Sequence, residues 1–251
     1  CGSAFKLYLL KALEDVVASG KAKMSDTLAL DEKNMSFPSG ILQEWPLQSR
    51  HTLETLAGLM ISVSDNTATD HIFNFIGLEK LRGYFPETCT ELLTTAQFIK
   101  LKFAFKELAK EYAKADAKRK KQILKELDAK KASDIDLSFL GKESVKPFLV
   151  DEIEWRISTL ELCRVIYSLR DNKLLRINPA TGIANKADWH IIGFKGGSEP
   201  GVLNFTWVMQ KTADAPFYTL SCTAVNAEED VDLKAFSVLA SRLINLTRLS
   251  N

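Results

Sequence analysis

The sequence predicts an α+β fold, with an antiparallel sheet flanked by helices and a mostly helical subdomain beside it. Helical periodicity dominates about residues 3–187, whereas strand-like runs and one more helical pattern fill about 188–251. The 251 residues are 46% hydrophobic, which is enough apolar material for one or two sizeable cores. A helical region followed by a β-meander and a terminal helix fits helices packed on one antiparallel sheet. We therefore predict a single domain over 1–251.

The first part of the chain is predicted to be helical around one long loop. Apolar residues recur at helical spacing over 3–18, and Gly20 ends this helix. The stretch 22–50 is punctuated by prolines and glycines, so we expect a loop with short extended pieces there. The pattern then predicts three further helices, at about 52–61, 67–75 and 78–84.

A charged helical insertion is predicted at about 97–132. The segment Lys100–Lys131 holds 12 Lys and Arg against 5 Asp and Glu, a net charge of +7 in a chain whose total is +1. Two apolar stripes at helical spacing predict a helical hairpin; they consist of Phe105, Leu108 and Tyr112, and of Ile123, Leu124 and Leu127. Its charge fits either a solvated helical face or a docking patch for an acidic partner or an anionic polymer.

The last part of the chain predicts one helix, three strands and a terminal helix. The helix covers Thr159–Leu169, with Ser158 or Thr159 as its cap. Strands are expected at about 189–195, 202–210 and 216–224, separated by turns that contain proline. A final amphipathic helix is expected at about 230–247.

Composition excludes several classes of function. The net charge of +1 gives no general attraction to nucleic acid, so no nucleic-acid partner is predicted. No apolar run reaches the roughly 18 residues of a membrane span. The three histidines are far apart in sequence and the four cysteines lack metal-ligand spacing, so neither a metal ion nor another cofactor is expected.

Three short motifs occur in one order: Ser3-x-x-Lys6, Ser64-Asp65-Asn66 and Lys195-Gly196-Gly197. Together they hold a hydroxyl nucleophile, groups that can pass a proton, and a cation beside a glycine. The first and third motifs are common by chance, whereas Ser-Asp-Asn is expected in roughly one such chain in twenty. The order and spacing therefore carry the argument for a shared site.

The motifs and their flanking residues resemble the penicillin-recognising serine enzymes, that is, the class A β-lactamases and penicillin-binding proteins. Residues 2–10 are similar to the start of their nucleophile helix, 51–70 to the segment with the second motif, and 192–198 to the strand that walls their active site. The 61 residues from Ser3 to Ser64 fit this family. The 131 residues from Ser64 to Lys195 exceed its usual spacing, which predicts an insertion.

The resemblance implies the β-lactamase/transpeptidase-like fold and a serine hydrolase that forms an acyl-enzyme on Ser3. Lys6 would be the general base, made neutral by burial and by a nearby cation. Ser64 would relay a proton to the leaving group, and Lys195 would attract a substrate carboxylate. A class A-like β-lactamase that hydrolyses β-lactam amides is the leading interpretation.

Other motif residues are predicted to bind substrate or to shape the site. Asn66 would hold a substrate amide, while Asp65 would face inward and fix its loop through backbone hydrogen bonds. Gly197 would let the strand approach the substrate, and the backbone N–H groups of Ser3 and Ser198 would form the oxyanion hole. Gly196 departs from the family, where a hydroxyl residue is usual, so carboxylate binding is expected to be weaker.

The residue that activates water for deacylation is the largest gap in the resemblance. Class A enzymes place a glutamate on the loop before the helix that corresponds to 159–169. Here that loop is 141–157, and its candidates are Glu154 and Glu152, neither of them in the usual sequence setting. The residues themselves favour interpreting Glu154 as a surface carboxylate or a partner of Arg156 over a deacylation base. Without a base, the acyl-enzyme would decay slowly.

Two alternative functions stay open at this point, beside the further possibility of a D,D-peptidase. The first is an esterase or amidase of the same fold with a non-β-lactam substrate, and the second is a noncatalytic binding protein on this fold. The family has a helix and two strands upstream of its nucleophile, so we expect that part to be missing from this sequence, leaving one sheet edge unpaired. The resemblance also implies a periplasmic or secreted location and a small-molecule β-lactam or ester substrate.

Overall fold

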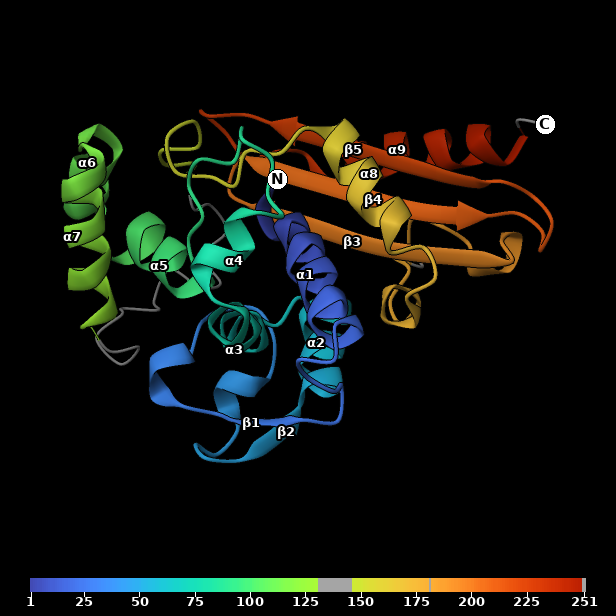
Figure 1. Cartoon of the computed structure of the whole chain (residues 1–251). Coiled ribbons are helices and arrows are strands. Elements are labelled where there is room, and N and C mark those ends of the chain that lie inside the picture. Colours follow the sequence, from blue (N-terminus) through green and yellow to red (C-terminus); the bar gives the residue numbers. More distant parts are fainter. Residues whose placement is uncertain (131–145, 181, 250–251) are drawn as a thin grey trace.

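The computed structural model describes residues 1–130, 146–180 and 182–249. Its main sheet is antiparallel, with the strand order β3–β4–β5. The strands are β3 (Ile191–Glu199), β4 (Val202–Gln210) and β5 (Phe217–Val225). In the described ranges no strand pairs with the outer edge of β5, and β3 forms the opposite edge, beside the start of the chain (Figure 1).

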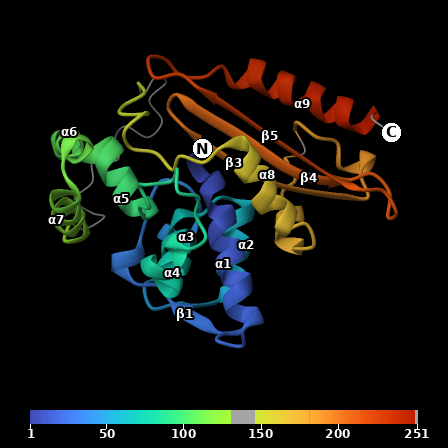
Figure 2. The same ribbon diagram turned by 45° about the horizontal axis from the view of Figure 1, so that its top comes forward.

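Helices cover both faces of this sheet. On one face lie α8 (Thr159–Ser168) and the 3-10 turn η1 (Gly2–Phe5), and on the other lies α9 (Leu233–Leu249) (Figure 2). All nine residues of β4 are buried, because the strand is central and sandwiched between these layers. Val208 points into the core on the α8 side, whereas Trp207 packs into the second core beneath α9.

A helical region hangs below the sheet in Figure 1 and carries the first two motifs. Its helices are α1 (Lys6–Ala18), α2 (Leu53–Ser62), α3 (Asn66–Ile76) and α4 (Leu78–Arg82). A two-stranded sheet of β1 (Thr27–Ala29) and β2 (Arg50–Thr52) closes its lower end. The short 3-10 turns are η2 (Glu32–Asn34), η3 (Leu42–Glu44), η7 (Lys173–Arg176) and η8 (Lys186–Asp188).

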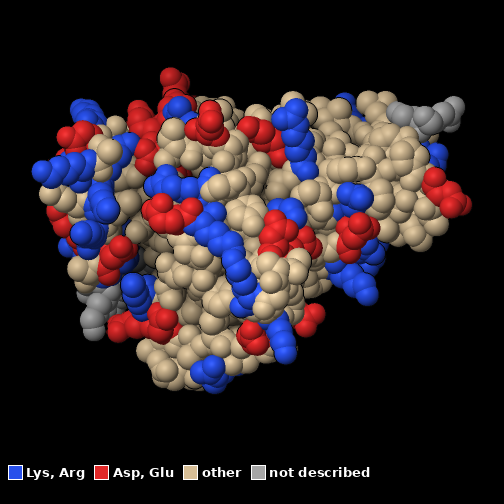
Figure 3. Space-filling view, in the orientation of Figure 1, with Lys and Arg blue, Asp and Glu red and all other residues tan. Residues whose placement is uncertain are grey.

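The charged segment is a helical hairpin, as predicted, but its first residues belong to the core. The hairpin consists of α6 (Lys106–Lys114) and α7 (Ala117–Asp128), far from the sheet in Figure 1. It follows α5 (Thr95–Ile99) and the π-helical turn η4 (Lys100–Ala104), which includes the buried Lys100 and Lys102. In Figure 3, basic and acidic side chains alternate over the hairpin's visible face. The predicted acidic partner stays a prediction.

The predicted fold class is confirmed, and the expected helices and strands agree with the observed ones to within a few residues. The largest difference is at β3, which was expected to end at 195 and continues to Glu199. The turn at Pro200 and Gly201 directly follows this longer strand, so the third motif lies inside β3. None of the helices within the described ranges has both the length and the apolar character that a membrane crossing requires.

Candidate active site

The start of α1 and the strand β3 meet at Ser3. A Cβ atom on Gly197 would lie 2.5 Å from the Ser3 nitrogen and 2.3 Å from the Cys1 oxygen, so only glycine allows this contact. Gly2 has a φ of +50°, and its own Cβ would lie 2.8 Å from the nitrogen of Ser198. The Ser3 and Ser198 backbones are thereby placed side by side, as an oxyanion hole requires. That role stays a prediction.

Lys6 lies fully buried one turn after Ser3 and points at the second motif. Its Nζ donates to the Ser64 backbone oxygen and to Asn66 Oδ1, both at 2.7 Å, and to Ser64 Oγ at 3.2 Å. Burial holds the pKa of Lys6 well below its usual value, and the nearby Lys195 lowers it further. Both causes were expected from the sequence, and both favour the neutral amine that a general base must be.

Ser64 connects the two lysines. Lys195 Nζ donates to Ser64 Oγ at 3.1 Å, on the hydroxyl that also contacts Lys6, and to the Gly196 backbone oxygen. Lys195 is buried, and this lowers its pKa to about 7. Ser64 has a φ of +57°, an uncommon backbone conformation that turns its side chain toward the lysines. The arrangement gives a continuous hydrogen-bonded path between two amines through one hydroxyl.

The other residues of the second motif hold this path in place. Asp65 is fully buried and accepts hydrogen bonds from the backbone nitrogens of Ile41, Leu42 and Ala68, which confirms its predicted structural role. Asn66 accepts from Lys6 and donates Nδ2 to the backbone oxygen of Phe37 at 2.8 Å. Asn66 thus orients Lys6, and its predicted contact with a substrate amide stays a prediction.

A packing reason accounts for glycine at the second position of the third motif. A Cβ atom on Gly196 would lie 2.7 Å from Cζ of Phe194 and 3.1 Å from the Asn204 backbone oxygen. The ring of Phe194 therefore occupies the space that a hydroxyl side chain at 196 would need.

A cavity of about 630 Å³ opens at these residues. It contains Ser3, Ser64 and Lys195 from the motifs, and the Ser3 hydroxyl forms no hydrogen bond with the described residues. The rest of its lining is rich in large apolar side chains, which include Phe98, Phe103, Trp155, Phe194 and Phe205. The cavity therefore combines a few polar groups with a largely apolar lining.

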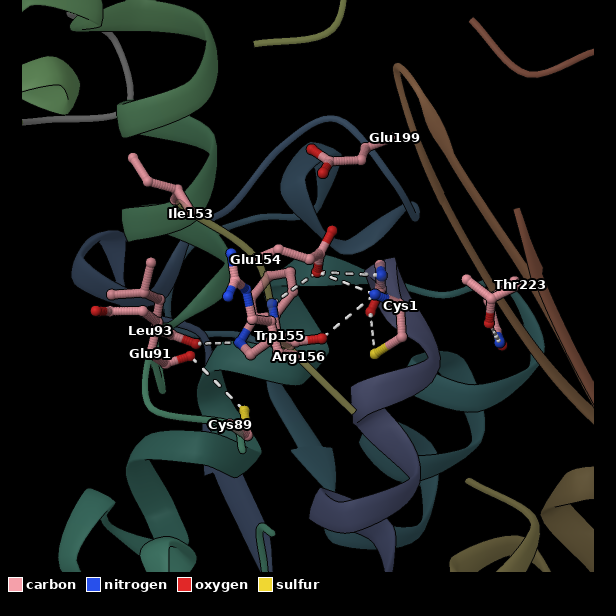
Figure 4. A network of polar contacts seen from close by, with 12 residues as sticks. Cys1, Cys89, Glu91, Leu93, Ile153, Glu154, Trp155, Arg156, Glu199 and Thr223 are labelled. Carbon is pink, nitrogen blue, oxygen red and sulfur yellow. Dashed lines mark hydrogen bonds and ion pairs between the residues drawn. The ribbon is translucent and has the colours of Figure 1, made fainter. Parts of the chain in front are cut away.

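The two glutamates predicted from the sequence to be deacylation bases differ in burial and in position. Glu152 is exposed and does not line the cavity, so it is not placed to activate a water molecule there, and its predicted role as a deacylation base is wrong. Glu154 is buried, with 7% exposure, so the interpretation as a surface carboxylate is also wrong. Its Oε1 accepts hydrogen bonds from the backbone nitrogens of Gly2 at 3.2 Å and Trp155 at 2.7 Å. These bonds hold Glu154 against the turn Gly2–Phe5 that carries Ser3, which we call the nucleophile turn (Figure 4).

The sequence reasoning missed Glu199, which lines the cavity. The longer β3 puts Glu199 on the same side of the strand as Lys195 and Gly197, since alternate residues share a face. Extending the predicted strand to the turn residues would have revealed it. Among the described residues, no group of three or more His, Cys, Asp and Glu side chains is placed to hold a metal ion.

The nucleophile turn, the Ser64 loop and β3, arranged on an α+β frame, define the penicillin-recognising serine enzyme fold. The sequence pattern of the Beta-lactamase enzyme family matches residues 1–135, more than half of the chain. The chain belongs to this family.

Solved structures show the same fold over almost the whole chain. The β-lactamase from Sphaerobacter thermophilus DSM 20745 is 17% identical with a TM-score of 0.59, covering 98% of this chain and 81% of that chain. The β-lactamase from Francisella tularensis is 15% identical with a TM-score of 0.61, covering 98% and 85%. A PBP-A mutant, solved as an acyl-enzyme complex with penicillin G, is 16% identical with a TM-score of 0.54, covering 98% and 80%. No curated protein sequence matches the chain significantly.

Proposed function

We propose that this protein is a serine hydrolase that forms an acyl-enzyme on Ser3 and acts on β-lactam amides, as a class A-like β-lactamase. One observation carries the proposal: the two buried amines of Lys6 and Lys195 share the hydroxyl of Ser64 beside the free hydroxyl of Ser3. Burying two amines near one another is unfavourable for stability, which points to a catalytic purpose.

In the acylation step, Lys6 takes the proton of Ser3 while the serine oxygen attacks the substrate carbonyl. A neutral amine has two N–H groups, enough for the two hydrogen bonds of 2.7 Å to the Ser64 backbone oxygen and Asn66, and in that state it no longer donates to Ser64 Oγ at 3.2 Å. The lone pair of Lys6 is then available for the Ser3 proton, and the lowered pKa of Lys6 supports this state. The Ser3 and Ser198 N–H groups would stabilise the oxyanion.

In the collapse of the tetrahedral intermediate, the carbon–nitrogen bond breaks and the leaving nitrogen takes the Ser64 hydroxyl proton. Ser64 recovers a proton from Lys6, which gained one from Ser3, so the acylation step is balanced. Lys195 has its pKa near 7 and supplies a positive charge at the same hydroxyl. The same cation would attract the carboxylate of a penicillin or cephalosporin.

An esterase or amidase with a non-β-lactam substrate is the second candidate. Phe194 fills the space for a hydroxyl side chain at 196, which removes a hydrogen bond that a substrate carboxylate would otherwise receive. The apolar lining of the cavity would suit an uncharged ester as well. The resemblance supports a periplasmic or secreted location for either activity, and this location is part of the proposal.

The decisive experiment follows the mass of the intact protein with time after addition of a penicillin or a cephalosporin. We expect an adduct with the mass of the opened drug, absent in Ser3→Ala. Ser39→Ala is the matched control, because Ser39 lines the same cavity and its hydroxyl makes a single long hydrogen bond within the described part of the chain, to the Val63 backbone oxygen at 3.4 Å. An adduct that persists in Ser3→Ala, or no adduct with either drug, would contradict the proposal. Adducts with simple esters alone would favour the second candidate.

A further inference from the structure

The cavity at Ser3 is lined from both faces of β3. Lys195 and Gly197 line it from the face that carries the nucleophile turn, whereas Phe194 and Phe205 line it from the face that packs under α9. Within the described ranges β3 is an edge strand, so one cavity can follow the strand around this edge. The cavity therefore has a second wall, which the proposed acylation chemistry does not use.

Two aromatic rings, those of Phe194 and Phe205, form this second wall, and we call it the aromatic wall. Their ring centres lie 6.1 Å apart, and Phe205 pairs with Gly196 across β3 and β4. Since residue 196 has no side chain, the ring of Phe194 lies over it. Behind the wall, the ring centre of Trp207 is 4.9 Å from that of Phe194, and the ring centre of Phe236 is 5.1 Å from that of Phe205. The wall is thus apolar and held in place by a packed aromatic core.

The aromatic wall lies at the leaving-group end of the site. Phe194 and Gly196 flank Lys195, and Lys195 contacts the Ser64 hydroxyl that gives its proton to the leaving group in the proposed reaction. The nucleophile turn contacts β3 further along the strand, at Gly197. A substituent on the leaving group that passes around the edge of β3 therefore meets the aromatic wall.

The aromatic wall offers no hydrogen bond to an anionic substituent. Lys195 is the one Lys or Arg that lines the cavity in the described part of the chain, and it is buried. Its Nζ already donates to Ser64 Oγ at 3.1 Å and to the Gly196 backbone oxygen. A carboxylate pressed against Phe194 and Phe205 would lose water without gaining a donor from these rings, which is unfavourable. An uncharged apolar group would instead gain from its burial there.

We propose that Phe194 and Phe205 select substrates whose leaving group carries an uncharged apolar substituent in place of a carboxylate. The substrate class is then a neutral ester or a neutral lactam. The proposal rests on the acyl-enzyme chemistry proposed above. For β-lactams it means that the attraction of Lys195 for the free carboxylate is smaller than the cost of placing this carboxylate against the aromatic wall, so that an ester of a penicillin reacts faster than the free acid.

Penicillin G and its methyl, propyl and butyl esters test this proposal, because they differ only at the carboxyl group on the leaving side. The second-order rate constant of acylation is followed by the mass of the intact 251-residue protein. Dividing it by the rate constant of the same compound with hydroxide removes differences in intrinsic reactivity. The methyl ester should react about tenfold faster than the free acid, because the cost of an unpaired carboxylate is absent. Each further buried CH2 should add up to about fourfold.

Phe205→Lys tests whether the aromatic wall is the cause of this preference. The lysine can bury its CH2 groups where the ring was and present its ammonium to the cavity, so the preference should reverse in favour of the free acid. Tyr218→Lys is the matched control, because Tyr218 packs against the same core beneath α9 but does not line the cavity. This variant adds the same charge and should keep the preference for the ester. Melting temperatures verify that both variants are folded.

Three results would each overturn the proposal: a free acid that reacts as fast as its methyl ester, no rise along the ester series, or an unchanged preference in folded Phe205→Lys. The ester series uses the wild-type protein, so it decides the matter even where Phe205→Lys does not fold. Absence of an adduct with penicillin G and with all of its esters would instead overturn the proposed function. The two failures are therefore distinguishable.

Discussion

Two buried groups of like-charged side chains lie near Ser3, one of lysines and one of glutamates, and burial shifts pKa values in the two groups in opposite directions. On one side, Lys6 and Lys195 bring two amines to one hydroxyl, and burial lowers both pKa values toward the neutral amine. On the other side, Glu154 and Glu199 bring two carboxyl groups together with one lysine, and burial raises the pKa of Glu199 toward the neutral acid. The comparison shows that like charges in one dry site are made tolerable by gaining or losing protons.

The largest expected effect is the loss of the amine that accepts the nucleophile's proton. Lys6→Met should lower the acylation rate about a thousandfold, because general-base catalysis contributes on that order. The same change leaves two acceptors, Asn66 Oδ1 and the Ser64 backbone oxygen, without their donor, so a modest loss of melting temperature is expected beside the loss of activity. Lys11→Met on the same helix is the control, because the one ion pair of Lys11 with a described residue is with Asp15, near the surface. Equal acylation rates in the two variants would refute the role of Lys6.

The glycine between the two groups is expected to be the next most sensitive position. Gly197→Ala would place a methyl group 2.3 Å from the Cys1 oxygen and 2.5 Å from the Ser3 nitrogen. β3 and the nucleophile turn must then separate, at a cost of about 1–3 kcal/mol in the free energy of unfolding. Urea denaturation measures this cost. Gly83→Ala, where the nearest atom is 3.5 Å away, should change it little, and comparable losses would show that the close contact is not what matters.

The titration of Lys195 should appear in the pH dependence of stability. In the folded protein its pKa is about 7, whereas in the unfolded chain a lysine keeps its proton to about pH 10.4. Between these values the unfolded state binds more protons, so the free energy of unfolding rises with pH, by up to about 1.4 kcal/mol per pH unit. The destabilisation is complete below about pH 7.

Lys195→Met should make this rise smaller and leave the part that Lys6 contributes, whereas Lys211→Met, at an exposed lysine just after β4, should leave the whole rise intact. Thermal or urea unfolding across this pH range checks the difference. If the free energy of unfolding changed with pH in the same way in the wild-type protein and in Lys195→Met, Lys195 would have an ordinary lysine pKa. The proposed effect of burial on this lysine would then be refuted.

The smallest effect is expected far from both groups, in the helical hairpin. Arg119 forms ion pairs with Glu111 at 2.6 Å and Glu126 at 2.7 Å, but it lies at the surface, where water screens such pairs. Arg119→Ala should therefore leave the urea midpoint almost unchanged, in contrast to Lys102→Ala, which leaves the buried Glu199 without its cation. A similar fall of the urea midpoint in both variants would mean that burial does not determine how much these ion pairs contribute to stability.

The lysine side of the site could be predicted from the sequence, whereas the buried group of Glu154, Glu199 and Lys102 could not. Ser3, Lys6, Ser64 and Lys195 lie in short local motifs, each at a helix start or in a loop or strand whose identity the pattern reveals. Glu154, Glu199 and Lys102 come from three segments with no shared motif, and only tertiary packing brings them together.

The ends of helices and strands were the second feature that the sequence predicted incompletely. Helices such as α1, α3 and α8 were predictable because their apolar residues repeat over several turns and their ends carry glycine or capping residues. The end of β3 was not, because two glycines and a serine precede Glu199 and favour a turn locally. Pairing with β4 from Ile191 to Glu199 overrides that preference. The same error concealed Glu199.

The ring of Phe194 over Gly196 also makes the order of sequence changes matter in evolution. A threonine or serine at 196 collides with that ring, so its arrival is harmful as long as residue 194 is phenylalanine. A smaller residue at 194 removes the obstacle but exposes the neighbouring Phe205, whose ring centre is 6.1 Å away. The two positions are therefore expected to be epistatic, while the Asn204 backbone oxygen, 3.1 Å from a Cβ atom at 196, limits the space whatever residue stands at 194.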